Sequence, residues 1–99
     1  MARFDVYQLR GGLVLDCQSD GFAHMPTRFV VPLEPPHEAL RIHHRLNPQF
    51  QVHGRAMVMV TQLAGTVRVR DLGDVVAALT RDEQHLAAQG AIDMLTSGV

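Results

Sequence analysis

The spacing of apolar residues changes once along this 99-residue chain, and this change most constrains the fold. Up to about residue 70, apolar and polar residues alternate in short runs, which is the pattern of half-buried β-strands. From Thr80 to Thr96 the apolar residues recur at helical spacing, and Gly98 stands where a helix commonly ends. The sequence therefore predicts a mainly β fold with one C-terminal α-helix.

Turn residues divide the first part of the chain into separate strands. We expect them at residues 3–9, 13–18, 28–33, 49–52, 56–62 and 67–70. Gly11 and Gly12 predict a two-residue hairpin turn, and Pro32 indicates the end of its strand or a sheet edge. The run 56–62 is the most apolar and is expected at the centre of the sheet. The segment 34–48 fits either one short helix or an excursion that carries a strand.

The last quarter has the features of a helix that packs on a sheet. Thr80 is expected to be the N-cap, with the Glu83 side chain reaching back to close a capping box. Gly90 interrupts the helix at a cost of about 1 kcal/mol relative to alanine. The buried arc is expected to consist of Ala87, Ala88, Ala91, Ile92, Met94 and Leu95.

Length and composition indicate one small globular domain spanning residues 1–99. Hydrophobic residues make up 46% of the chain and charged residues 19%, which excludes a disordered tail. The longest stretch without a charge, residues 56–67, is too short to span a bilayer, and early charges break any signal-peptide apolar region. The single Cys17 excludes an intramolecular disulfide and is expected to be a small buried hydrophobe. We expect a cytoplasmic protein that dimerises.

Charge is distributed unevenly, although the net charge is only −1. Residues 39–70 carry five arginines and no acid, whereas residues 71–99 carry five acids and one arginine. Arginine forms bidentate pairs with carboxylates and phosphates. The middle of the chain is therefore suited to an acidic partner segment or to a nucleic acid, unless these arginines simply cover solvated strand faces.

The order of several short motifs resembles that of the CcdB toxins of bacterial toxin–antitoxin modules. The resemblance runs from residue 3 to residue 99 and rests on the segments Phe4–Tyr7, Asp16–Asp20, Arg28–Leu33, Leu72–Ala77, Thr80–Glu83 and Ala91–Leu95. It implies an SH3-like small antiparallel β-barrel or sheet, of the kind that CcdB and MazF toxins share, with a C-terminal helix. It also implies a homodimer that needs no cofactor and is not an enzyme.

The resemblance further implies a function by binding. Such a protein binds the GyrA subunit of DNA gyrase and traps the gyrase–DNA cleavage complex, and it meets DNA only through the gyrase or the antitoxin complex. A CcdA-like antitoxin with an acidic, disordered C-terminal segment neutralises it, and Arg41, Arg45 and Arg55 are the residues expected to bind that segment. The matching gyrase-binding positions are Gly21, Phe22, Asp93, Thr96, Ser97, Gly98 and Val99. We expect the loop and the helix end to form one surface on each protomer.

This chain departs from the family pattern at the helix end. The pattern has two aromatic residues, the second a tryptophan, where this chain has Thr96 and Ser97. A buried aromatic anchor at an interface is often worth about 2 kcal/mol or more. A divergent CcdB-like protein that no longer poisons gyrase is therefore one alternative.

A MazF-like endoribonuclease toxin is the other alternative. RNA cleavage needs a cation and an acid–base pair, which Arg68 or Arg70, Asp71 and a loop histidine would supply. Few aromatic residues are available to stack on RNA bases. His37, His43 and His44 do not have the spacing of a metal site, so we expect exposed loop histidines and no metal. Ser19 and Thr27 adjoin turns and are expected to be turn or cap hydroxyls.

Overall fold

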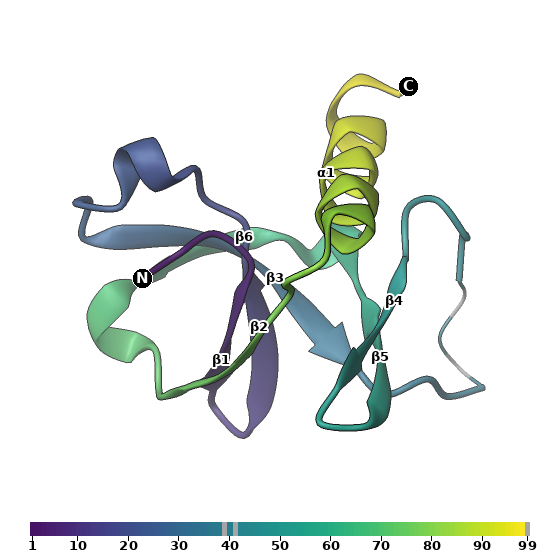
Figure 1. The fold of residues 1–99 in the computed structure, drawn as a ribbon, viewed down its shortest axis with the longest axis horizontal. Helices are drawn as coiled ribbons and strands as arrows, with labels where there is room; N and C mark the ends of the chain where they lie inside the picture. Colours follow the sequence, from purple (N-terminus) through teal and green to yellow (C-terminus); the bar gives the residue numbers. More distant parts are fainter. Residues whose placement is uncertain (39, 41, 99) are drawn as a thin grey trace.

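The computed structural model describes residues 1–38, 40 and 42–98. Within this part of the chain seven strands form one antiparallel sheet and a 16-residue helix ends the fold (Figure 1). The elements are β1 (Asp5–Leu9), β2 (Gly12–Asp16), β3 (Thr27–Glu34), β4 (Gln49–Val52), β5 (Arg55–Met59), β6 (Gly65–Arg68), β7 (Val75–Ala78) and α1 (Asp82–Ser97). The expected fold class, mainly β with a C-terminal helix, is confirmed.

Strand β3 is the centre of the sheet, and the expectation that residues 56–62 would be central is wrong. The strand order is β4-β5-β3-β2-β1-β7, and β6 pairs with β3 as well. Residues 27–30 of β3 pair with β6, and Leu33 and Glu34 pair with β5. The eight-residue β3 is long enough to hold two partners in succession on one side while β2 lies on its other side. The sheet therefore bends into a nearly closed barrel.

Pro32 lies inside this central strand, so it marks neither the end of a strand nor a sheet edge. Backbone N and C=O groups of one strand residue point to the same side of the strand. The carbonyl of Pro32 accepts a hydrogen bond from the Val60 N–H at 2.9 Å. The backbone nitrogen of Pro32, which carries no hydrogen, therefore faces the gap between β6 and β5 along one side of β3. No regular hydrogen bond between strands is lost there.

Both sharp hairpins use two residues with positive φ. Arg10 (φ 49°) and Gly11 (φ 82°) join β1 to β2, while His53 (φ 52°) and Gly54 (φ 76°) join β4 to β5. Such turns match the right-handed twist of the flanking strands. The first turn lies one residue earlier than the expected Gly11 and Gly12, because Gly12 already pairs with Leu9. The second turn lies between the expected strands 49–52 and 56–62.

The bent sheet encloses one large core and one small one. The large core gathers apolar residues from β1 to β5 and from the middle of α1, where Ala88 and Ala91 are fully buried. The small core consists of Tyr7, Val14 and Val30 on the other sheet face, covered by Val67 and Leu72. The chain from β6 to β7 covers this second face, and its 3₁₀ turn (Val69–Asp71) replaces the end of the expected strand 67–70.

The helix begins one residue later than expected. Arg81, not Thr80, is the N-cap, and its backbone N–H donates to the Gln84 side-chain oxygen at 3.2 Å. Gln84 thus takes the place expected of Glu83, whose carboxylate instead pairs with the Arg81 side chain. Gly98 ends the helix in the left-handed region (φ 77°), as expected, with its N–H donating to the Met94 carbonyl.

Other segments differ from the expectations drawn from local patterns. The described residues of 35–48 form turns and bends and contain neither of the two expected elements. The expected strand 56–62 ends at Met59 and continues into a 3₁₀ turn (Thr61–Leu63). Strand β7 is an unforeseen addition to the sheet. No helix among the described residues is long and apolar enough to cross a membrane.

Candidate functional site

The segment after β2 is a fixed loop that displays one large apolar side chain. The Ser19 hydroxyl oxygen accepts a hydrogen bond from the Gly21 N–H at 3.2 Å and caps a 3₁₀ turn over Asp20–Phe22. Gln18 bridges this turn to β3, since its side-chain amide donates to the Phe22 carbonyl and accepts from the Phe29 N–H. Phe22 remains 56% exposed. The expectation that Ser19 is a capping hydroxyl is confirmed.

The last turn of α1 is exposed and extends beyond the sheet (Figure 1). The Thr96 hydroxyl donates to the Ile92 carbonyl at 2.9 Å, and the Ser97 hydroxyl donates to the Asp93 carbonyl at 2.6 Å. Both hydroxyls are therefore engaged within the helix. Leu95, expected in the buried arc, is 45% exposed because the sheet ends before this turn. Val99 lies outside the described residues.

The loop and the helix end lie apart in the view of Figure 1. In Figure 1 the turn over Asp20–Phe22 lies on one side of the view, and the end of α1 projects from the other. The expectation that the loop and the helix end form one surface on each protomer stays a prediction.

The arginines expected to bind an antitoxin lie in separate places. Arg45 is exposed beside a hollow lined also by Leu86 and Gly90 of α1. Arg55 is exposed on the β4–β5 hairpin, at a different hollow that includes residues of the β1–β2 hairpin. Arg41 lies outside the described residues.

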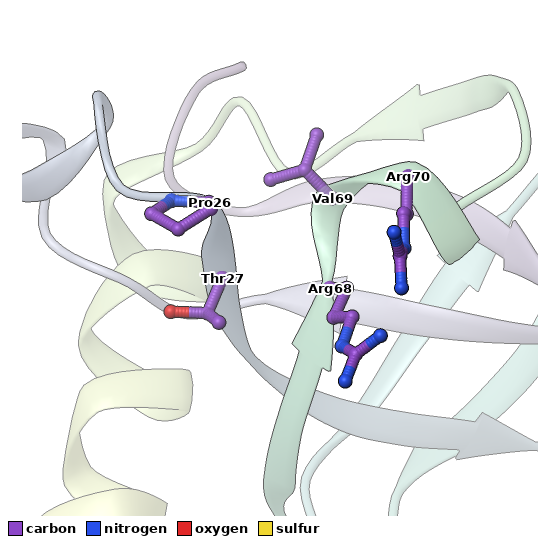
Figure 2. Close-up of a pocket in the computed structure, with 5 residues that line it drawn as sticks. All are labelled: Pro26, Thr27, Arg68, Val69 and Arg70. Atoms are coloured by element: carbon purple, nitrogen blue, oxygen red, sulfur yellow. The ribbon is translucent and has the colours of Figure 1, made fainter.

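Two further arginines line a third hollow, of about 540 Å³. Arg68 ends β6 opposite Thr27, the first residue of β3, and Arg70 follows in the 3₁₀ turn. Figure 2 shows the two guanidinium groups on the same side, with the Thr27 hydroxyl turned away from them. The described lining contains no carboxylate and no imidazole, so Asp71 and a loop histidine do not join the arginines as the ribonuclease alternative requires. Thr27 begins a strand and is not a cap.

A buried ion pair, which the sequence reasoning missed, lies beneath the second sheet face. Asp16 and Arg28 are both fully buried, and Arg28 Nη2 lies 2.6 Å from Asp16 Oδ2. Arg28 Nε also donates to Oδ2, and the Gln18 N–H donates to Oδ1. The sequence did contain a sign of this burial. Asp16 is two residues from Val14 and Arg28 is two residues from Val30, so each charge shares a strand face with a valine of the small core. Burial raises the pKa of Tyr7, and the nearby carboxylates of Asp5 and Asp16 add to this shift.

The remaining polar groups of interest have structural roles or lie in solvent. Cys17 is buried, as expected, and desolvation raises the pKa of its thiol to about 12. His37, His43 and His44 are exposed, as expected. The His43 and His44 rings stack with their centroids 5.3 Å apart, because they lie in a turn and not in a regular element.

One protein-family model matches nearly the whole chain. The family model described as "CcdB protein" matches residues 3–98. The chain belongs to the CcdB family. Membership supports the expectation of a toxin from a toxin–antitoxin module. No curated protein sequence matches this CcdB family member.

Solved structures of toxins share the fold of this CcdB family member. An Mtb toxin is 19% identical, with a TM-score of 0.72, and the match covers 88% of this chain and 94% of that chain. The Mycobacterium tuberculosis toxin MazF-mt6 is 20% identical, with a TM-score of 0.70, and the match covers 90% of each chain. At these identities the likeness establishes the common toxin fold.

Proposed function

We propose that residues 1–99 form one toxin domain that binds the GyrA subunit of DNA gyrase and traps the gyrase–DNA cleavage complex without a reaction of its own. Membership of the CcdB family over residues 3–98 is the observation that carries this proposal. The exposed final turn of α1 supports it, because an effector surface must be free to meet its target.

In this proposal only a few side chains at the end of α1 contact gyrase. Leu95 offers apolar surface, and Gly98 turns the chain out of the helix. Thr96 and Ser97 contribute shape more than hydrogen bonds, because their hydroxyls already donate to helix carbonyls. Asp93 accepts a hydrogen bond from Gln89 at 2.9 Å, which holds its carboxylate on the exposed helix face. Gyrase binding is then weaker than that of a protein with aromatic residues here.

Gly21 and Phe22 enter the proposal through a homodimer. A two-fold dimer presents two loops and two helix ends, and the target, the GyrA pair, is two-fold as well. The separation of loop and helix end on one chain is compatible with such an arrangement, since each contacts a different part of the target. Sedimentation analysis is expected to give twice the 11.0 kDa of one chain.

Neutralisation is proposed to come from an antitoxin with an acidic, unfolded C-terminal segment. Arg41, Arg45 and Arg55 are its proposed contacts, and their charge would offset part of the ordering entropy of the segment. The toxin–antitoxin complex would repress its own transcription, with DNA bound through the antitoxin. Because gyrase acts on the chromosome, the proposal places the protein in the cytoplasm.

A gyrase cleavage assay with the purified protein tests this function. Added to gyrase, supercoiled DNA and ATP, the protein is expected to increase the amount of linear DNA released by detergent and protease. DNA that stays fully supercoiled at saturating protein would contradict gyrase poisoning and would favour a divergent binding protein.

A MazF-like ribonuclease is the second candidate, favoured by the shared fold and by the hollow that Arg68 and Arg70 line. It lacks an acid–base pair within that hollow, in the residues that the structure describes. Incubation of single-stranded RNA with the purified protein separates the two candidates. Intact RNA agrees with the gyrase proposal, whereas cleavage that Arg70→Gln abolishes would establish the ribonuclease.

A further inference from the structure

The arginine pair Arg68 and Arg70 is held on a firm frame. Arg68 is fixed by the pairing of β6 with β3, opposite Thr27. The Val69 N–H donates to the Pro26 carbonyl at 2.9 Å, and the Leu72 N–H donates to the Val69 carbonyl at 3.1 Å. These bonds fix the backbone on both sides of Arg70. The backbone that carries the two side chains is therefore fixed before binding, and only the side chains themselves lose rotamer freedom when they bind.

Both arginines are exposed and have no carboxylate partner among the described residues. The ion pairs there join Asp16 with Arg28, Glu34 with His37, and Glu83 with Arg81, all at other places. Asp71 follows Arg70 in the chain but does not line the hollow. Two guanidinium groups that face one hollow repel each other, and an anion placed between them removes that repulsion. The hollow is thus suited to a negatively charged group.

We propose that Arg68 and Arg70 bind a carboxylate side chain of an acidic peptide, with a neighbouring apolar residue of that peptide against Pro26 and Val69. This inference rests on the proposed function in one respect, since the peptide would be the acidic segment of the antitoxin. It adds a site apart from Arg45 and Arg55, which line other hollows.

The lining favours a peptide over a nucleic acid. Proteins that bind single-stranded nucleic acid combine a basic groove with aromatic side chains on which the bases stack. The described lining of this hollow contains no aromatic residue. Instead, the apolar residues Pro26 and Val69 line the hollow together with the two arginines, and Figure 2 shows them on the side away from the guanidinium groups. A carboxylate next to an apolar side chain complements that combination.

Fluorescence anisotropy with a labelled short peptide of alternating glutamate and leucine tests the site on the full chain. The wild-type protein is expected to bind this peptide, and glutamine in place of glutamate should remove the binding. R68Q/R70Q is expected to weaken binding about tenfold, which corresponds to two exposed charge pairs. Arg70→Gln should weaken it more than the matched control Arg10→Asn, which removes one charge at the β1–β2 turn, where asparagine tolerates the positive φ.

Several results would overturn the site. They are a lack of saturable binding, equal affinity in wild type and R68Q/R70Q, and tighter Arg68-dependent binding of labelled oligouridylate, which would indicate a nucleic-acid site. A lower sedimentation mass of R68Q/R70Q would instead make a second copy of this chain the occupant. The gyrase assay separates the two proposals, because R68Q/R70Q should still stabilise cleaved DNA. Peptide binding by a protein that leaves gyrase unaffected would refute only the proposed function.

Discussion

At the residue scale, the most consequential side chain is Arg28, which lies fully buried in the central strand. It pairs with Asp16, but its Nη1 has no hydrogen-bond partner among the described residues. A buried pair of this kind is a weak source of stability, because desolvation of both charges offsets most of their attraction. It nevertheless disfavours registers of β2 and β3 that would leave either charge alone in the core.

Removal of one charge should therefore cost far more than removal of both. Arg28→Met leaves the Asp16 carboxylate buried and unpaired, and the free energy of unfolding is expected to fall by about 3–5 kcal/mol. The double variant D16V/R28M should recover most of that loss. Urea unfolding measures both, with the exposed Arg68→Met as the control expected to change little. A double variant as unstable as Arg28→Met would contradict this view of the pair.

Cys17 gives the protein a predictable response to alkaline pH. In the unfolded chain its thiol ionises around its ordinary pKa of 9.0, whereas burial raises the pKa to about 12 in the folded state. The unfolded state therefore releases its proton first, so this contribution to stability is complete below pH 9.0 and is lost towards pH 12.

The expected slope is a loss of about 1.4 kcal/mol per pH unit within that interval. Tyr7 acts in the same direction but only above its ordinary value of 10.0, so the first pH unit above 9.0 reports Cys17. Urea unfolding at closely spaced pH values measures the slope. Cys17→Ala is the control, and its free energy of unfolding should be nearly constant between pH 9.0 and pH 10.0. An unchanged slope in that variant would assign the effect to another group.

At the element scale, α1 contains two glycines with opposite requirements. Gly90 lies mid-helix, and a Cβ added there meets nothing within 4 Å. Gly98 also has open space, but its φ of 77° lies in the left-handed region that other residues rarely adopt. The space is equal at both positions, so backbone conformation alone decides the sign of a substitution.

The two alanine variants should shift stability in opposite directions. Gly90→Ala is expected to stabilise the protein by about 0.5–1 kcal/mol, because alanine loses less backbone entropy on folding. Gly98→Ala is expected to cost about 1 kcal/mol, through strain at the helix end. Thermal unfolding followed by circular dichroism measures both variants. Shifts of the same sign would show that the last turn is not held in its left-handed cap in solution.

At the scale of the whole molecule, the fold separates a buried scaffold from exposed ends. The core takes Ala88 and Ala91 from the middle of α1, whereas the last turn contributes no buried residue among those described. The segment that the proposed function needs is therefore not the segment that holds the fold together.

Deletion of Gly98 and Val99 should exploit this separation. Loss of gyrase-dependent DNA cleavage is expected, because the truncated helix end no longer presents its terminal contact. The far-UV circular dichroism spectrum and antitoxin binding should remain close to those of the full chain, which controls for folding. If the truncated protein still stabilises cleaved DNA, then the helix end is not the effector surface.

Much of the fold was predictable from the chain alone, because local spacing carries the information. The alternation of apolar residues predicted most strands, and Gly98 marked a helix end through its backbone freedom. The capped loop was visible in Ser19, and the burial of Cys17 followed from its position in an alternating run. All of these depend on residues close together in the chain.

Tertiary structure alone decided the features that depend on pairing between distant segments. The sequence did not reveal that β3 changes partner at Pro32, that β7 joins β1, or that Arg28 is buried against Asp16. Likewise, only the folded chain brings Pro26 and Thr27, which are distant in the sequence, to the hollow that Arg68 and Arg70 line. Local patterns determine which face of a strand is apolar, but the closure of the sheet determines which faces meet.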